Sequence, residues 1–223
     1  MTLRLLLTSL ILAAAAPLTA GDRLVIDDFS SARPGTVPAS WSPHKSLWGG
    51  AAKAPSVLTI KEENGNSYLA ADSAGDSVTL SKPFRWNMKR YPVLSWRWRA
   101  RKLPAGGNER KKKTNDSAAG VYVCFRGLSP LPYCLKYVWS ASLPVGTSLP
   151  SPYRKASRIL VLRSGPEGLG EWLEEKRDLA ADYAKVFGRP PEKDPVGIAV
   201  LTDSDDTRSS AAADYDDFAV SGR

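Results

Sequence analysis

Short runs of strand-forming residues follow one another along almost the whole chain. Ten such runs, each of four to nine residues, are rich in Val, Ile, Leu, Tyr and Trp. They span residues 24–29, 57–61, 68–71, 77–80, 93–101, 120–126, 134–140, 158–163, 197–202 and 215–220. Asn64-Gly65 and Ala74-Gly75 are hairpin turn signals, and several prolines fall between the runs rather than inside them. This pattern predicts many short antiparallel strands.

One stretch keeps the period of a helix. Its apolar residues recur at helical spacing, and Asp178 before them is a suitable N-terminal cap, while Gly188 is a suitable stop. The apolar residues concerned are Leu179, Tyr183, Val186 and Phe187. Ten strands and one short helix predict an all-β fold, an antiparallel β-sandwich of jelly-roll type.

The N-terminus has the form of a secretory signal. Met1 to Ala20 combines a basic start, an apolar run and a small-residue end. No later segment approaches eighteen uninterrupted apolar residues, so we expect no transmembrane segment once the signal is removed. We therefore expect a periplasmic or secreted protein, with residues 21–223 forming a single β-sandwich domain.

The chain has two cysteines, Cys124 and Cys134, on either side of a short segment rich in Pro and Gly. If the flanking strands form a hairpin, the two thiols face each other across it. An oxidising compartment favours a disulfide between them, and two buried free thiols are the alternative.

The run VLSWRWRAR, residues 93–101, alternates strictly between apolar and cationic residues. Because strand side chains have a period of two, Trp96 and Trp98 share one face, while Arg97, Arg99 and Arg101 share the other. The arginines could line a groove for an anionic or hydroxyl-rich ligand, because a guanidinium binds carboxylates and phosphates bidentately. Alternatively the tryptophans belong to the core and the arginines are solvated or pair with acids. A third reading exposes the tryptophans as a sugar-stacking platform.

The net charge of the chain is +8, and four consecutive cations occupy residues 110–113. This run lacks interleaved aromatic residues and precedes polar and small residues, so it reads as a solvated loop. We expect no nucleic-acid partner. Anionic envelope glycans are better suited to use the charge.

Six aspartates lie between Asp203 and Asp217 in this basic chain. The spacing of Asp203, Asp205 and Thr207 resembles the start of a calcium loop. However, Arg208 stands where an EF-hand needs Gly, and Asp214 stands where it needs Glu. The segment therefore does not form an EF-hand.

The first and last predicted strands carry the same short word, an aromatic residue next to two aspartates: Ile26-Asp27-Asp28-Phe29 and Tyr215-Asp216-Asp217-Phe218. Pairing of these strands gathers the carboxylates. Asp27 falls on the same face as Val25 and Phe29, and Asp216 falls on the same face as Phe218 and Val220. A carboxylate that faces the core needs a partner. A structural calcium ion held by Asp27 and Asp216 is one solution, and backbone N–H groups or an arginine is another.

Several longer motifs occur in a recognisable order. They are YPVLSWRWRARKLPAGG, TNDSAAGVYVCF, VLRSG, GIAVLTDSDDT and ADYDDF. Their order resembles a bacterial secreted family known only as a domain of unknown function, number three thousand and forty-seven. That resemblance implies no established activity and no catalytic residues. The Asp-Asp-Phe words also resemble those of carbohydrate-binding jelly rolls that hold a structural calcium, a likeness of architecture alone.

Three functional hypotheses follow. The first is a glycan- or envelope-binding module whose ligand is a saccharide or an anionic envelope glycan. Its predicted groove residues are Arg97, Arg99, Asn115, Asp116, Lys136, Trp139, Asp203 and Asp205. The second is a glycan-active hydrolase or lyase that uses carboxylates of the Asp203–Asp214 loop, since the sole histidine, His44, and the absence of a G-x-S-x-G motif disfavour a triad. The third is a structural protein without a ligand, whose acids balance its arginines.

Overall fold

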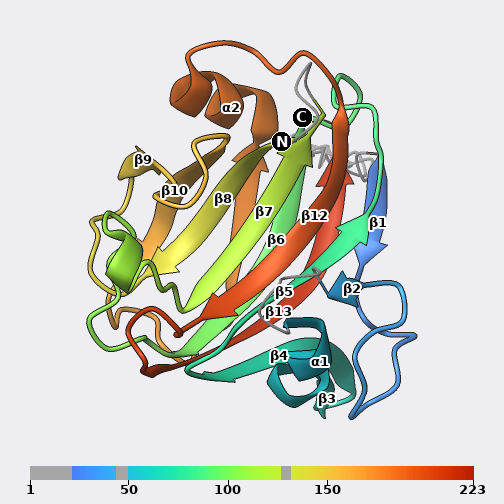
Figure 1. Ribbon diagram of the computed structural model, residues 1–223. Helices are drawn as coiled ribbons and strands as arrows, with labels where there is room; N and C mark the ends of the chain where they lie inside the picture. The colour runs from blue at the N-terminus through green and yellow to red at the C-terminus, as the bar shows by residue number, and fades with distance from the viewer. Residues whose placement is uncertain (1–21, 44–49, 127–131) are drawn as a thin grey trace, which may run out of the picture.

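The computed structural model describes residues 22–43, 50–126 and 132–223 of the chain. Two β-sheets are stacked face to face, as a sandwich (Figure 1). The six-stranded sheet contains β11 (Leu173–Asp178), β6 (Val93–Lys102), β13 (Ser210–Ser221), β4 (Asn66–Ala74) and β3 (Leu58–Glu63), with β1 (Arg23–Asp27) also paired to β13. The seven-stranded sheet follows the order β2 (Ser42–Pro43), β5 (Ser77–Pro83), β12 (Pro195–Asp203), β7 (Ala119–Phe125), β8 (Tyr133–Ser140), β10 (Ser157–Ser164) and β9 (Ser148–Pro150).

The predicted all-β sandwich is confirmed, and each of the ten predicted runs overlaps a strand, although β13 begins at Ser210, well before the predicted start at Tyr215. The short strands β2 and β9 and the charge-rich edge strand β11 were not predicted, nor was the helix α1 (Gly50–Val57). One pairing differs from an antiparallel sandwich, because β8 and β10 are parallel. The chain between them forms β9, which pairs with the far side of β10.

The core between the sheets is rich in aromatic residues. On β6, Trp96 and Trp98 are fully buried, and they meet Tyr137 and Trp139 of β8 at ring-centroid distances of 5.3 and 6.2 Å. Burial of such large apolar surfaces is the main force that joins the two layers. The tryptophans of VLSWRWRAR therefore belong to the core, as one of the three readings predicts.

The predicted helix is α2 (Leu179–Phe187). The Asp178 side chain accepts a hydrogen bond from the Ala181 N–H at 3.0 Å, and Gly188 ends the helix in a left-handed conformation. Both ends thus follow the expected capping rules. Tyr183 packs edge-on against Phe125 of β7, with 4.9 Å between ring centroids.

Strands β7 and β8 form the hairpin that the cysteine positions suggested. Cys124 lies directly opposite Cys134, and the two form a disulfide. Most of the connection, residues 127–131, lies outside the described residues, as do the predicted signal segment 1–20 and His44.

The first and last strands pair, as predicted, but β13 contains a bulge that changes its faces. Asp216 lies opposite Arg97, whereas Ala219 lies opposite Ser95, so β13 has one extra residue. Asp217 has a φ of 56°, in the left-handed region. The bulge places Phe218 in the core and leaves Asp216 among the polar side chains that face outward from the six-stranded sheet. The expectation that Asp216 and Phe218 share a face is therefore wrong.

Candidate binding groove

The row of arginines on β6 is paired with acids of its own sheet. Arg97 pairs with Asp216 at 2.6 Å, and Arg99 and Arg101 both pair with the buried Asp214, at 2.8 and 3.0 Å. The Trp172 ring also stacks against Arg97 and Arg99, each at 4.7 Å from the ring centroid. The donors of this row are thus used within the protein. This agrees with the reading in which the tryptophans belong to the core and the arginines pair with acids.

The carboxylates of Asp27 and Asp216 do not form a common site. Asp27 accepts hydrogen bonds from Trp41 Nε1 at 2.8 Å and from Lys82 Nζ at 2.5 Å. Asp216 accepts from Arg97 and from Asn66 Nδ2, the latter at 2.8 Å. Each carboxylate therefore has protein donors of its own, the alternative to calcium that the sequence left open.

A groove of about 690 Å³ lies on the outer face of the seven-stranded sheet. Its floor comes from alternate residues of β5, β12, β7 and β8, whose intervening residues point into the core. Gly197 and Ala199 of β12 are small and leave room at the centre. The segment before β10 forms one wall, and the loops that follow β6 and β12 close one end. The groove residues used below are Thr79, Asn115, Tyr122, Lys136, Tyr153, Asp203, Asp205 and Asp206.

Two tyrosines line this groove. Tyr122 projects from the floor on β7, directly opposite Lys136 of β8, whose Nζ lies 5.4 Å from the centre of the Tyr122 ring. Tyr153 belongs to the wall, where its side chain is exposed and its hydroxyl donates to Asp206. The pKa of Tyr153 is raised well above its usual value. The larger cause is partial desolvation of the side chain by its surroundings, and the second is the hydrogen bond to Asp206. Its phenol therefore stays protonated at neutral pH.

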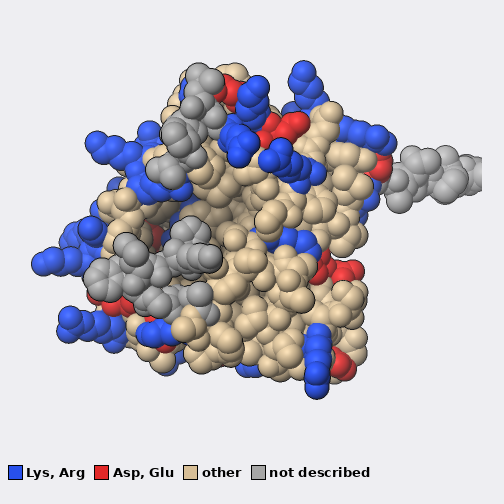
Figure 2. All heavy atoms as spheres, turned by 45° about the vertical axis from the view of Figure 1, so that its right-hand side comes forward, with Lys and Arg blue, Asp and Glu red and all other residues tan. Residues whose placement is uncertain are grey.

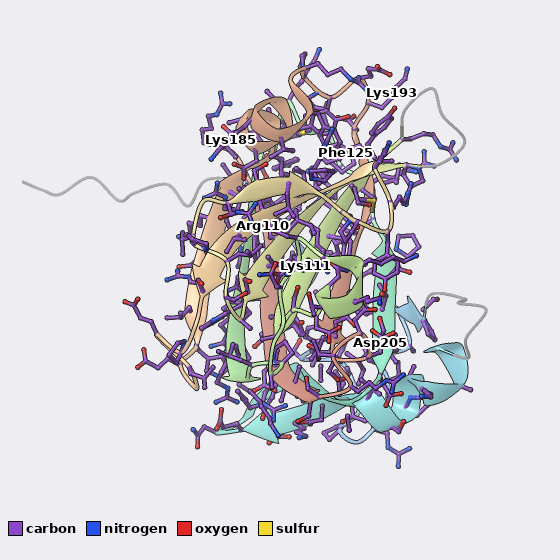
Figure 3. All side chains as sticks on the ribbon, turned by 60° about the vertical axis from the view of Figure 1, so that its left-hand side comes forward. Arg110, Lys111, Phe125, Lys185, Lys193 and Asp205 are labelled. Atoms are coloured by element: carbon purple, nitrogen blue, oxygen red, sulfur yellow. A yellow bond between two sulfur atoms is a disulfide. The ribbon has the colours of Figure 1, made fainter. Side chains whose placement is uncertain are left out.

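Five of the eight predicted groove residues gather at one end of the groove or directly beneath it. Asn115, Lys136, Asp203 and Asp205 line it, and carboxylate oxygens of Asp116, Asp203 and Asp205 lie within 4.8 Å of one another. Figure 3 shows Asp205 in the loop after β12, toward the opposite end of the molecule from Phe125 and Lys193. Arg97 and Arg99 instead lie on the other sheet, and Trp139 is buried in the core.

Asp116 fixes the position of the loop after β12. Its carboxylate accepts from the backbone N–H groups of Asp206 and Thr207, at 3.2 and 2.7 Å, and from the Thr207 hydroxyl. The aspartates are thus held by a network that links the loop after β6 to the loop after β12. Sequence neighbours alone do not reveal this link.

Asp203 is the most deeply buried acid that lines the groove. Its side chain is 4% exposed, and its Oδ1 has no hydrogen-bond partner among the described residues. Burial raises the pKa of the Asp203 carboxyl well above its usual value, although the nearby ammonium of Lys136 acts in the opposite direction. The Asn115 Oδ1, also buried, is unpartnered in the same part of the structure.

Lys136 is the buried cation of this end. Burial alone would lower its pKa, but the interactions with Tyr122, Asp203 and Glu109 outweigh burial and raise it. The Glu109 carboxylate is also buried, and it accepts from the hydroxyls of Ser117 and Ser140. The ammonium of Lys136 therefore stays charged among several acids.

Four of the groove residues named above, Thr79, Tyr122, Tyr153 and Asp206, were missing from the sequence prediction. Tyr122 had a usable signal, because it alternates with Val121 and Val123 and so must face away from the core. Tyr153 lies in an irregular segment between β9 and β10, where no periodic pattern indicates which side chains face the groove.

Positive charge is not concentrated on the face seen in Figure 2. Lys and Arg side chains lie mainly around the margins of that view, and uncharged residues occupy much of its centre. Within the described ranges, no helix is both long enough and apolar enough to cross a bilayer.

A family model described as a protein of unknown function (DUF3047) matches residues 40–219. The chain belongs to this family. The match confirms the resemblance that the ordered motifs suggested, and it brings no activity with it. A comparison with curated protein sequences finds no match for this DUF3047 chain.

Solved structures similar to this DUF3047 member include proteins with different printed roles. A family 11 carbohydrate-binding module of a cellulase from Clostridium thermocellum has 8% identity and a TM-score of 0.45, covering 92% of this chain and 97% of the module. The cleaved adhesin domain of Lys-gingipain from Porphyromonas gingivalis has 14% identity and a TM-score of 0.43, covering 91% and 99%. Endoglucanase 3 of Trichoderma harzianum has 10% identity and a TM-score of 0.44, covering 92% and 99%. Similarities this weak carry no argument about function.

Proposed function

We propose that the protein is a saccharide-binding protein of the cell envelope, and that its binding site is the groove on the seven-stranded sheet. The single observation that carries this proposal is the groove itself: about 690 Å³ of open space that combines tyrosines with buried polar atoms without partners. Sites for small molecules are typically concave and apolar, with a few placed polar groups.

The side chains of the groove suit a ligand that has both apolar faces and hydroxyl groups. Tyr122 and Tyr153 offer aromatic surface, and Thr79 offers a hydroxyl on the opposite side of the floor, on β5. The free Oδ1 atoms of Asn115 and Asp203 are acceptors for hydroxyl donors. Sugar rings present C–H faces and hydroxyl edges together, so they match this combination.

The envelope location is part of the proposal. It is supported by the signal-like N-terminal sequence and by the disulfide between Cys124 and Cys134, since disulfides persist in oxidising compartments. Whether the protein is retained in the periplasm or released is tested by fractionating cells that produce the full-length chain.

A second candidate function is glycan cleavage, favoured by one observation. Asp203 and Asp205 are neighbouring carboxylates at one end of the groove, with oxygens within 4.8 Å of each other, and glycoside hydrolysis requires two carboxyl groups beside the scissile bond. Asp214 is not available for such chemistry, because it pairs with two arginines on the other sheet.

The proposal is tested by screening the protein on a glycan array and by measuring the affinity for each hit by calorimetry. We expect Tyr153→Ala to weaken binding by about tenfold or more, because the variant removes an aromatic stacking surface, a kind of contact that contributes roughly 1–3 kcal/mol when nucleobases stack on aromatic side chains. Tyr153 is 53% exposed, so the variant should fold normally.

The matched control is Trp172→Ala, which removes an aromatic ring from the outer face of the six-stranded sheet and should leave the affinity unchanged. Chromatography of each bound glycan after incubation detects cleavage. Released fragments would favour the second candidate, and an array without any hit would leave the structural hypothesis.

A further inference from the structure

The closed end of the groove holds more negative than positive charge. The Lys136 ammonium lies near Asp203 and Glu109, and carboxylate oxygens of Asp116 and Asp205 lie within 4.8 Å of an oxygen of Asp203. None of the ion pairs between described residues involves Asp116, Asp203 or Asp205. Buried carboxylates without counter-charges are costly, so this end lacks positive charge.

Two buried oxygen atoms here also lack partners. Asp203 is 4% exposed and Asn115 is 6% exposed, and the Oδ1 atom of each has no hydrogen-bond donor. Both residues line the same end of the groove, where Asp203 is one of the three clustered carboxylates. Elsewhere in the described chain, buried acids such as Asp214 and Asp216 have several donors each. Among the described residues, the other buried side-chain atoms without a partner are nitrogens, so the unpartnered buried oxygens are those of Asp203 and Asn115.

We propose that Asp116, Asp203 and Asp205, with the side-chain oxygen of Asn115, form a calcium-binding site. The donors are all oxygen atoms, which favours a hard cation over zinc or copper. Ca²⁺ accepts about six to eight oxygen ligands in flexible geometry, whereas Mg²⁺ demands a near-ideal octahedron, so carboxylate and amide oxygens from two loops and a strand end suit Ca²⁺ better. The clustered carboxylate oxygens lie within 4.8 Å of one another, close enough for one ion to contact all three residues.

The site is prepared by hydrogen bonds that do not depend on the ion. Asp116 accepts from Asp206 and Thr207, which holds the loop carrying Asp205 against the loop carrying Asn115. Carboxylates that bind metals are commonly fixed by such outer contacts. Asp205 is exposed, so the ion has a path from solvent.

Two ammonium groups near the groove lie over tyrosine rings. The Lys136 ammonium lies over the Tyr122 ring at 5.4 Å, and the Lys112 ammonium lies over the Tyr153 ring at 4.9 Å. Neither forms an ion pair with a proposed ligand in the described structure. The carboxylates outnumber these cations, so the site keeps a negative potential, and its Ca²⁺ affinity should fall as the salt concentration rises.

The test uses the protein after dialysis against EDTA, with Ca²⁺ or Mg²⁺ as the only added ligand. We expect one Ca²⁺ to bind in calorimetry and the melting temperature to rise by roughly 5–10 °C at a hundredfold excess over Kd. Mg²⁺ at the same concentration should bind at least about tenfold more weakly. Asp205→Asn is the main variant, because Asp205 is exposed and its substitution should leave the fold intact. This variant should weaken Ca²⁺ binding at least about tenfold. Asp203→Asn is the second variant.

The matched control is Glu62→Gln, which removes an exposed carboxylate from β3 and should bind Ca²⁺ as the unaltered protein does. No heat and no change in melting temperature with Ca²⁺ would overturn the proposal. Equal affinity in Asp205→Asn would do the same, and so would equal affinity for the two metals. The calcium site shares Asn115 and Asp203 with the proposed saccharide groove. No saccharide is present in this experiment, so its outcome is separate from that of the proposed function.

Discussion

At the scale of single residues, Asp214 shows how the six-stranded sheet carries charge on its outer face. The side chain is 1% exposed and bridges the guanidinium groups of Arg99 and Arg101. Burial raises the pKa of the Asp214 carboxyl, while the two arginines act to lower it. The arginines remain partly exposed, so they keep some contact with water when their partner is removed.

We predict that Asp214→Asn lowers the free energy of unfolding by about 2 kcal/mol, because Arg99 and Arg101 lose their shared buried partner and keep only the exposed carboxylates of Glu63 and Asp72. Urea denaturation at neutral pH measures the change. Glu174→Gln on β11 is the control, since Glu174 forms only an exposed pair with Lys176 and should alter stability by less than about 0.5 kcal/mol. Similar losses in both variants would contradict the assignment.

At the scale of elements, α2 depends on its N-terminal cap. Asp178 accepts from the Ala181 N–H and has a second contact with Arg223. The hydrogen bond from Ala181 is the main cause that lowers the pKa of Asp178. A lowered pKa means that the ionised carboxylate stabilises the fold above the unfolded-state pKa of about 3.9, and that this contribution is lost as the pH falls through the folded-state value.

Asp178→Ala should therefore cost about 1 kcal/mol at pH 7, and the difference from the unaltered protein should shrink below about pH 3. Asp178→Asn keeps a capping oxygen without the charge, so its smaller loss should vary less with pH. Paired urea titrations at the two pH values decide this. A difference that stays constant or grows on acidification would show that the charge of Asp178 does not act in this way.

The elements also show what the sequence could and could not provide. Strict alternation, as in VLSWRWRAR, divided β6 into two faces but left open which face enters the core, and helical spacing with two caps predicted α2. β11 was not found because LEEKRD is nearly all charged, a composition that an edge strand tolerates. The parallel pairing of β8 with β10 depends on contacts distant in sequence, to which local patterns are blind.

The same distinction applies to the candidate site. Residue type identified the acids and Lys136, because such side chains need partners wherever they are buried. The face on which they lie depends on strand order, which places Arg97 and Arg99 on one sheet and Asp203 on the other. Tyr153 depends on the path of a loop, and the chain has no pattern that predicts it.

At the scale of the whole molecule, the disulfide joins two central strands of the sheet that forms the groove. Cys124 and Cys134 both line the floor, and each lies next to a residue of the closed end, Tyr122 or Lys136, on the same face. The bond closes a loop between residues with a sequence separation of 10. It stabilises the protein mainly by reducing the conformational entropy of the unfolded chain.

Replacing both cysteines, Cys124→Ser with Cys134→Ser, should lower the free energy of unfolding by about 2–3 kcal/mol. Guanidinium denaturation of the oxidised, reduced and doubly substituted proteins measures this. The reduced protein should behave like the double variant. If the reduced protein is as stable as the oxidised one, the bond contributes nothing beyond the strand pairing.

The bulge at Asp217 sets a limit on how this chain can vary. Side chains of a strand alternate between its two faces. A single residue added to β13 or lost from it next to the bulge would therefore move every later side chain of the strand to the opposite face of the sheet. Phe218 would then turn to water while an aspartate entered the hydrophobic layer beside Phe29 and Trp41. Insertions and deletions can thus accumulate in the loops of the sandwich. The number of residues in β13 must stay constant, because it determines which side chains pack between the two sheets.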